Sequence, residues 1–263
     1  TEPEEFKEQE LLNWFENEYK SEQETTEGIF APWAIYKEDF QKIGGHDPLF
    51  APQSKEDSDI FNRFILAGYK VVQTRKGCVY HMTCRGSRFA DGAKRNPDGQ
   101  VFMKNRETDE WLAQNIRSTR NFIRKWGTMV EHNEYLKPII TPIYNIGFEL
   151  TEAADVDTIR LLEPHCCYMV VPAAEEIAQY IEEEQPNTQY DLSKRLHQDL
   201  PNTPTYDIRV RFNPWRLNNN SITILQQLPK IIKDSGEEGQ EFELDIFEIS
   251  IGEMIPKVLH LLQ

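Results

Sequence analysis

Excess positive charge is missing from this sequence. Its 263 residues include 29 Lys and Arg against 44 Asp and Glu, which gives a formal net charge of −15 at pH 7. A protein that binds nucleic acid needs a basic face to neutralise phosphates, so this composition argues against that class. A nucleotide ligand remains compatible with the charge, because it needs only a local site.

Long apolar segments are missing too. No run of about 18 apolar residues occurs, so we expect no membrane-spanning helix. The acidic start, TEPEEFKEQELLNWFENEYK, does not resemble a signal peptide. It also lacks an initiator methionine, and we therefore expect the chain to begin inside a longer protein.

Cysteine is scarce. Four cysteines are too few for a disulfide scaffold at this length, and we expect reduced thiols in a cytoplasmic protein. The segment CVYHMTC places Cys78, His81 and Cys84 close together. On the strand expected here, the two cysteines share one face and His81 points the opposite way, so a zinc site is not expected.

The apolar content is nevertheless sufficient for a core, with 39% hydrophobic and 11% aromatic residues. Gly127 and the polar segment EHNEYLKP (131–138) interrupt the periodic pattern. They predict two domains, 1–130 and 131–263, and an α/β (α+β) fold class for the chain.

The first domain reads as helices joined by short strands. We expect an acidic amphipathic helix over roughly 1–22, a helix over KEDFQKI (37–43) ended by two glycines, and a helix within 54–70 ended by Gly68. A strand pair is expected over 70–83. An amphipathic helix is expected over 105–126, and the apolar residues on one side of it are Trp111, Leu112, Ile116, Phe122, Ile123 and Trp126.

In the second domain, strands and helices alternate. Strands are expected at 138–150, 166–171, 206–214 and 241–251, and helices at 155–163, 173–184, 192–200 and 222–236. Two successive β-α-β units predict a ferredoxin-like α/β sandwich with an extra helix. Since this half has no nucleophile–base pair, metal cluster or glycine-rich phosphate loop, we interpret it as an accessory module for binding, packing or assembly.

The segment SKEDSDIFNRFILAGYK (54–70) puts three carboxylates before an apolar helical run. One explanation is structural: Ser54 and Asp57 are spaced like a capping box, and negative charge suits a helix N-terminus. Asp59 and Arg63 would then add about 0.3–0.5 kcal/mol as an exposed i,i+4 pair. The other explanation is that Glu56 and Asp57 form the acidic end of an active site.

Three motifs in fixed order bear on this choice: IGGHD (43–47), EDSDIFNR (56–63) and VYHMTCRGSRF (79–89). Their order resembles the C-terminal half of GT-A nucleotide-sugar glycosyltransferases of the family 2 type, and the polypeptide N-acetylgalactosaminyltransferases share the layout. The motifs are also similar to uncharacterised glycosyltransferase-like proteins of large phages and algal viruses. The resemblance spans about residues 25–126 and implies a partial GT-A-like first domain.

The resemblance implies roles for particular residues. Asp57 is the general base that takes a proton from the acceptor hydroxyl, and Glu56 positions the acceptor or Asp57. His81 is a ligand of a divalent metal, manganese or magnesium, that assists the leaving group. Arg85 and Arg88 are placed to contact phosphate oxygens. The alternatives are a structural strand-end histidine and solvated loop arginines.

On the same resemblance, Trp33 and Asp47 belong to the substrate-binding side. Trp33, in APWAIY, is either a platform for a sugar or acceptor, or a core residue. The sequence departs from the family in one respect: the nucleotide-binding half, which ends in an apolar strand and Asp-x-Asp, is not present. The DSD at 57–59 follows FAPQSK and not an apolar strand, so it belongs to the helix.

These observations predict a glycosyltransferase-like protein that is the acceptor-side catalytic part of an enzyme with an accessory domain. Its expected partners are a nucleotide-sugar donor and an acceptor. Without the donor half, this chain should bind donor weakly and turn it over little. The rival interpretation is a non-catalytic binding or assembly module that retains a degenerate GT-A outline, and a zinc-binding protein is a distant third.

Overall fold

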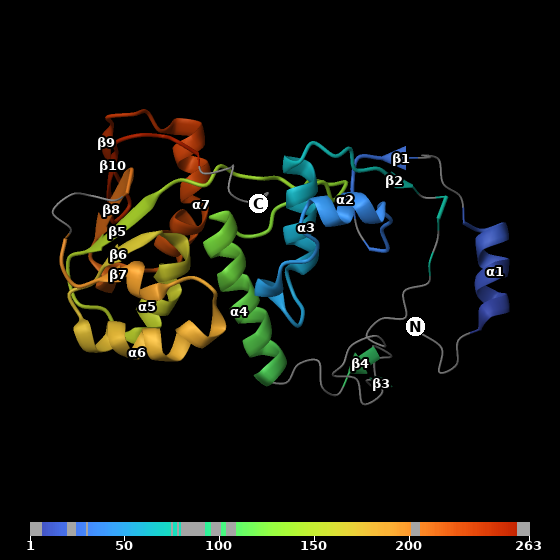
Figure 1. The fold of residues 1–263 in the computed structure, drawn as a ribbon, viewed down its shortest axis with the longest axis horizontal. Coiled ribbons are helices and arrows are strands. Elements are labelled where there is room, and N and C mark those ends of the chain that lie inside the picture. The colour runs from blue at the N-terminus through green and yellow to red at the C-terminus, as the bar shows by residue number, and fades with distance from the viewer. Residues whose placement is uncertain are drawn as a thin grey trace.

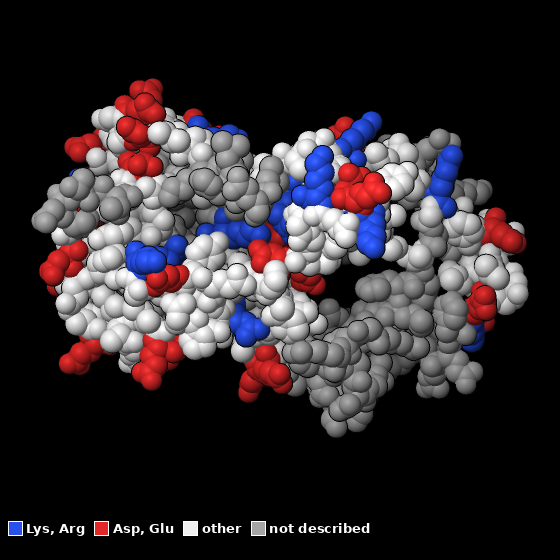
Figure 2. All heavy atoms as spheres, in the orientation of Figure 1, with Lys and Arg blue, Asp and Glu red and all other residues white. Residues whose placement is uncertain are grey.

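The computed structural model describes residues 7–19, 25–29, 31–74, 76–77, 79, 93–95, 101–103, 109–200 and 206–256. Two parts of the chain lie on either side of the long helix α4 (Asp109–Trp126), as Figure 1 shows. No helix in the described ranges is long and apolar enough to cross a membrane. On the face drawn in Figure 2, several Lys and Arg side chains lie near the junction of the two parts.

The part that follows α4 is built on a six-stranded mixed sheet. In spatial order its strands are β7 (Leu196–His197), β6 (Tyr168–Val170), β5 (Ile146–Leu150), β8 (Ile208–Phe212), β10 (Phe247–Ile251) and β9 (Glu241–Leu244). The first four are parallel, and β10 is antiparallel to both of its neighbours. This mixed sheet with its helices confirms the predicted α/β class.

One face of the sheet carries the core. Alternate strand residues such as Phe148 and Val210 are fully buried with residues of α5 (Val156–Leu162), α6 (Ala174–Glu184) and α7 (Asn219–Ser235). On β8 the intervening Arg209 and Arg211 are exposed. The helices and the sheet therefore form two layers, and the outer face is polar at β8, whereas Tyr168, Val170 and Tyr206 form a small buried cluster beside it.

The strand pairing is ferredoxin-like only in its last unit. There β8 and β9 lie on either side of β10, as in a split β-α-β unit, whereas β5 and β6 are direct neighbours. Two segments of this part also differ from their predicted elements. Residues 192–200, predicted as a helix, form the short helix η4 (Leu192–Lys194) and the edge strand β7. Residues 241–251, predicted as one strand, form a hairpin.

The part before α4 contains mainly short elements. They are α1 (Glu8–Asn17), β1 (Thr25–Thr26) paired with β2 (Gln73–Thr74), α2 (Lys37–Lys42), the 3-10 helix η1 (Pro48–Phe50), α3 (Glu56–Leu66), and β3 (Ala93–Arg95) paired with β4 (Val101–Met103). Helix α1 buries none of its residues, and Leu12 and Trp14 are exposed. Of the strand pair predicted over 70–83, the described part contains only β2.

The predicted capping box at the start of α3 does not form. Ser54 and Lys55 both have positive φ values, 79° and 73°, so Lys55 is the N-cap and no side chain caps the helix. The helix thus begins one residue later than a box from Ser54 to Asp57 requires. The carboxylates do lie in the first turn, where the helix dipole favours them.

The predicted end of α3 at Gly68 is confirmed. Gly68 has φ of 80° and donates its backbone N–H to Ile65, while the N–H of Tyr69 reaches the carbonyl of Phe64 at 3.0 Å. These two bonds make a Schellman motif, which needs a left-handed residue and favours glycine.

Helix α4 buries only half of its predicted apolar side. Phe122, Ile123 and Trp126 are at most 5% exposed, whereas Leu112 and Ile116 are 44% and 54% exposed. The exposed half of the helix lies beside an open groove, so the periodicity predicted the helix correctly but overestimated its burial.

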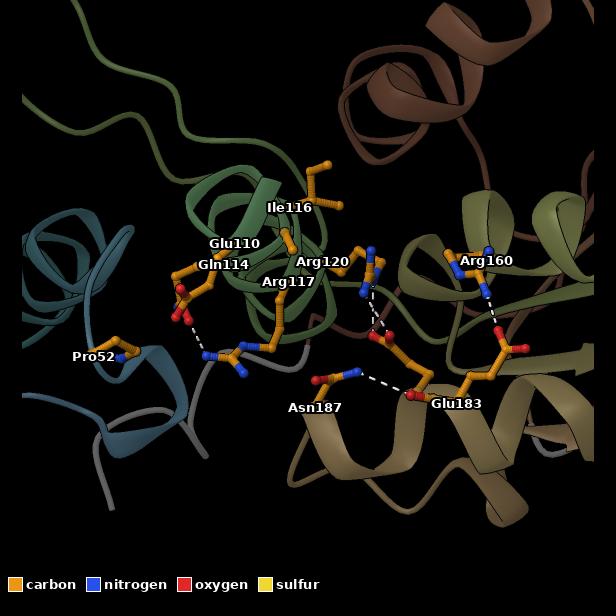
Figure 3. A pocket seen from close by; sticks show the side chains of 11 residues that line it. Pro52, Glu110, Gln114, Ile116, Arg117, Arg120, Arg160, Glu183 and Asn187 are labelled. Carbon is orange, nitrogen blue, oxygen red and sulfur yellow. Dashed lines mark hydrogen bonds and ion pairs between the residues drawn. The ribbon is translucent and has the colours of Figure 1, made fainter. Parts of the chain in front are cut away.

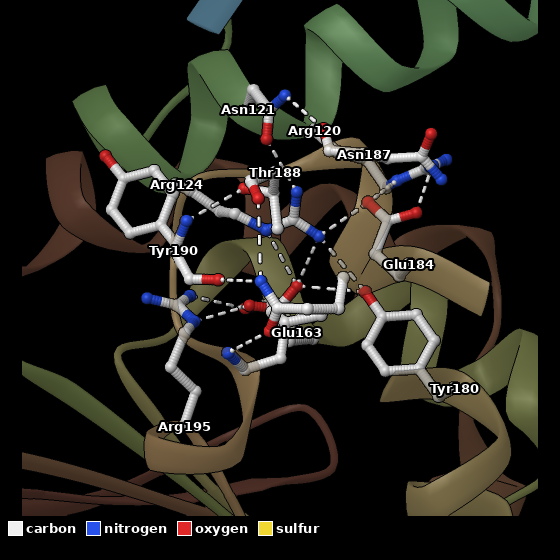
Figure 4. A network of polar contacts seen from close by, with 12 residues as sticks. Arg120, Asn121, Arg124, Glu163, Tyr180, Glu184, Asn187, Thr188, Tyr190 and Arg195 are labelled. Carbon is white, nitrogen blue, oxygen red and sulfur yellow. Dashed lines mark hydrogen bonds and ion pairs between the residues drawn. The ribbon is translucent and has the colours of Figure 1, made fainter. Parts of the chain in front are cut away.

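A buried ionic network joins α4 to the sheet-containing part (Figure 4). Arg124 donates from Nε and Nη2 to Oε2 of Glu163, at 2.9 and 2.7 Å, and from Nη2 to Oε1 of Glu184 at 2.8 Å. Arg120 adds a bidentate pair with Glu184 at 2.8 and 2.6 Å. The side chains of Arg124 and Glu163 are both fully buried.

The network is closed by Arg195, which donates to the carboxylate of Glu163 and to two backbone carbonyls. Burial alone would raise the pKa of Glu163, but the charges and hydrogen bonds of Arg195 and Arg124 outweigh it and hold this pKa below its ordinary value. Helix α4 thus contacts both parts of the chain, and the division at residues 130 and 131 stays a prediction.

Replacing Arg124 should destabilise the protein strongly. In Arg124→Gln two buried carboxylates lose a charged partner, which should lower the free energy of unfolding by about 3–5 kcal/mol. The matched control is Arg211→Gln, because Arg211 pairs with Glu248 at 2.9 Å with both side chains about half exposed. It should cost less than about 1 kcal/mol. Urea unfolding measures both, and similar losses in the two variants would contradict this assignment.

A buried histidine lies next to this network. No described residue is a hydrogen-bond partner for the buried Nδ1 of His165. Burial lowers the pKa of His165 from 6.5 to about 4, although the charge of Glu163 opposes the shift. Because the folded pKa is the lower one, the unfolded chain binds more protons between these values. His165 therefore reduces stability as the pH falls through that window.

The expected effect of His165 is a loss of about 2 kcal/mol in unfolding free energy between pH 7 and pH 5, beyond any other pH dependence. His165→Gln should remove this loss, and His132→Gln, at an exposed histidine, should keep it. Urea unfolding at both pH values measures the difference. An equal pH dependence in wild type and His165→Gln would show that His165 does not titrate as described.

Candidate active site

The turn of the IGGHD motif is tied to α3 by one buried arginine. Arg63 donates to the carbonyl of Ile43 and to that of Gly45, both at 2.6 Å. Gly44 and Gly45 have φ values of 87° and 67°, which suit glycine. The predicted exposed pair of Arg63 with Asp59 is instead buried, since their side chains are 5% and 0% exposed.

Asp59 is an internal anchor. It accepts hydrogen bonds from Nε1 of Trp126 and Nε of Arg63, both at 2.9 Å, and its Oδ1 lies 2.6 Å from Nζ of Lys125. All three donors are protein side chains, and the carboxylate is fully buried. Asp59 therefore joins α3 to α4 and is not available to a substrate.

Asp47 is also held by Lys125, whose Nζ lies 2.6 Å from its Oδ2. It caps η1 by accepting from the backbone N–H of Leu49 at 2.9 Å. Burial alone would raise the pKa of Asp47. The hydrogen bonds from Lys125 and Leu49 and the charges of Lys125 and Arg63 outweigh burial and hold this pKa below its ordinary value. These contacts give Asp47 a positioning role in the loop, and its predicted contact with substrate stays a prediction.

Glu56 and Asp57 differ from these two aspartates. Both are half-buried in the first turn of α3, and neither makes a salt bridge with a residue that the structure describes. Burial raises the pKa of Glu56 and the charge of Asp57 raises it further, while backbone N–H groups and the nearby His46 partly offset the shift. A half-buried carboxyl with a raised pKa beside a second carboxyl is an arrangement that acid–base chemistry uses.

Trp33 lies above this region in an aromatic cluster. Its ring meets Phe61 and Phe64 edge-on, with centroids 5.9 and 5.8 Å apart, and His46 lies 6.2 Å away. The side chain is partly buried against the small core around α3. Packing thus explains much of the role of Trp33, and a platform formed by its remaining exposed surface stays a prediction.

The predicted residues His81, Arg85 and Arg88 lie outside the described residues, as do Cys78 and Cys84. Within the described ranges, no group of three or more His, Cys, Asp or Glu could hold a metal ion. Glu56 and Asp57 offer carboxylate oxygens of the kind that manganese and magnesium accept. They would fit such an ion only together with further ligands.

A groove that the sequence did not predict lies between α4, α6 and the loop before α3 (Figure 3). Its volume is about 630 Å³, and its lining includes Pro52, Gln114, Arg117, Arg120 and Glu184. The sequence carries no signal for it, because Ile116 belongs to a face that its spacing predicts as buried, and only the structure shows this residue exposed beside the groove.

Comparison with known proteins bears on this half of the chain. Residues 12–84 match a family model described as the N-terminal domain of galactosyltransferase. No curated protein and no solved structure matches the chain. The matched stretch contains the IGGHD turn and the Glu56–Asp57 pair, and it supports a glycosyltransferase-like protein.

The pKa of Glu56 should depend on Asp57. We expect Glu56 to titrate above its ordinary value, and Asp57→Asn to lower its pKa because a neighbouring negative charge is removed. Carbon-13 NMR of the side-chain carboxyl measures the titration. The control is Glu38→Gln, which changes a carboxyl in the first turn of α2. An unchanged pKa of Glu56 in Asp57→Asn would show that the two groups are not coupled.

Proposed function

We propose that this protein is a glycosyltransferase that moves a sugar from a nucleotide-diphosphate donor to an acceptor hydroxyl, with Asp57 as the general base. One observation supports this most: in the stretch that matches the galactosyltransferase model, Glu56 and Asp57 form no salt bridge with a described residue, whereas Asp47 and Asp59 share Lys125. Glu56 and Asp57 are also partly exposed, so a substrate can reach them, whereas Asp59 is fully buried.

The proposed reaction is a single displacement. The carboxylate of Asp57 takes the proton of the acceptor hydroxyl as its oxygen bonds to the anomeric carbon. The bond from that carbon to the diphosphate breaks at the same time, and the nucleoside diphosphate leaves with the electron pair. Glu56, beside Asp57 in the first turn of α3, would orient the acceptor or Asp57.

The leaving group needs positive charge. A divalent cation, manganese or magnesium, would neutralise the departing diphosphate when bound. In this proposal His81 is one of its ligands, Arg85 and Arg88 contact phosphate oxygens, and Trp33 and Asp47 shape the substrate side. The placement of Asp47 by Lys125 keeps the loop before α3 in one position, which favours a preorganised site.

Removing the base should abolish transfer. We expect Asp57→Asn to reduce nucleoside diphosphate release about 10²–10⁴-fold, because amides cannot accept the proton. Donor binding should change little. The assay uses UDP-galactose or GDP-mannose with manganese and neutral sugar acceptors, and Glu38→Gln is the matched control.

Two outcomes would contradict the proposal. Full transfer by Asp57→Asn would remove Asp57 as the base. Absence of both donor binding and turnover in the wild-type chain, and in a version extended upstream, would favour the non-catalytic binding or assembly module instead.

A further inference from the structure

The groove between α4 and α6 has the dimensions of a ligand site. Its volume of about 630 Å³ lies within the usual range of about 300–1,000 Å³ for small-molecule pockets. Figure 3 shows side chains of α4 on one wall and Asn187, Glu183 and Arg160 on the other. The groove therefore lies between α4 and the sheet-containing part, and Pro52 from the part before α4 completes its lining.

The groove adjoins the loop that leads to the candidate base. Arg117 donates to the carbonyl of Ala51 at 3.2 Å, and Gln114 donates to that of Gln53 at 3.0 Å. Pro52 is part of the lining, and Glu56 follows it by four positions in the chain. The lining thus includes the chain segment that continues to Glu56 and Asp57.

The charges of the lining are balanced. It contains three arginines, Arg117, Arg120 and Arg160, and three glutamates, Glu110, Glu183 and Glu184. Arg120 is paired with Glu184, and Arg160 with Glu183. Arg117 and Glu110 remain, one charge of each sign, so the lining has no net charge and a polyanion would gain little here. The lining favours a neutral ligand.

The lining also offers mixed hydrogen-bonding groups. Gln114 is already bonded to Gln53, Ser118 and Arg117. Among the described contacts, acceptors remain on Glu110 and on the side-chain oxygen of Asn187, and donors remain on Nε and Nη1 of Arg117. Hydroxyl groups do both, so a ligand rich in hydroxyls matches this set. Ala113 and Ile116 add apolar surface on which the C–H faces of sugar rings can pack.

We propose that this groove binds a neutral oligosaccharide, which serves as the acceptor of the transfer proposed above. The binding itself follows from the groove, whereas the word acceptor rests on the proposed function. The sheet-containing part then contributes to substrate binding through α6, which gives the accessory domain a role.

Binding can be measured without a donor. The probes are maltotetraose, cellotetraose and tetra-N-acetylchitotetraose, with tetragalacturonate as the anionic comparison, titrated into the full chain and followed by amide NMR. At least one neutral probe should bind with a Kd of about 1 mM or below and shift signals of groove residues. Tetragalacturonate should bind more weakly.

Ile116→Glu tests the location, because Ile116 is exposed and its replacement adds a charge to the groove without uncovering a core. We expect about tenfold weaker binding, or about 1.4 kcal/mol. Leu12→Glu is the control, since Leu12 is a similarly exposed helical residue outside the groove.

Three results would overturn the groove assignment: no neutral probe binding up to about 10 mM, tighter binding of tetragalacturonate, or equal binding by Ile116→Glu and wild type. Oligosaccharide binding without any transfer would leave the groove assignment standing and contradict only the proposed function. Transfer activity that is the same in Ile116→Glu and wild type would leave the proposed function standing and contradict the groove as the acceptor site.

Discussion

The buried guanidinium of Arg124 is the interaction on which the arrangement of this protein depends. It lies on α4 and is surrounded by Glu163, Glu184 and the hydroxyl of Tyr180, all from the sheet-containing part. A charge placed there without partners would cost several kcal/mol, so the network forms only when α4 is docked in this position. The docking is therefore specific as well as stable, and it fixes one wall of the groove.

The same helix fixes the candidate site on its other side. Lys125 binds Asp47 and Asp59, Trp126 binds Asp59, and Gln114 binds the carbonyl of Gln53. Both the loop before α3 and α3 itself are therefore attached to α4. The position of Glu56 and Asp57 relative to the sheet-containing part follows from these contacts. An enzyme that must hold an acceptor hydroxyl against a base gains from such a rigid connection, because small displacements of reacting groups are costly.

Local pattern predicted the elements that have strong periodicity or clear ends. The apolar spacing predicted the helices α3, α4 and α6, and Gly68 predicted the end of α3. These features could be predicted because they depend on residues that are neighbours in sequence. The burial of Asp59 and Arg63 was not predictable in this way, since two of the donors to Asp59 come from residues 125 and 126. The edge strand β7 was not predicted, because a strand of two residues shows no periodicity. The groove was not predicted either, because residues 52, 117 and 187, which line it, are far apart in the sequence.

The proposed function requires the donor and the metal to bind near the start of α3. Paramagnetic broadening of amide NMR signals by Mn²⁺ in the presence of UDP-galactose tests this directly, with Mg²⁺ as the diamagnetic reference, and it detects weak binding. We predict broadening centred on residues 43–47, 54–60 and 79–89 that grows when UDP-galactose is added. Broadening that does not depend on UDP-galactose, or that centres on the polar face of the sheet, would contradict it.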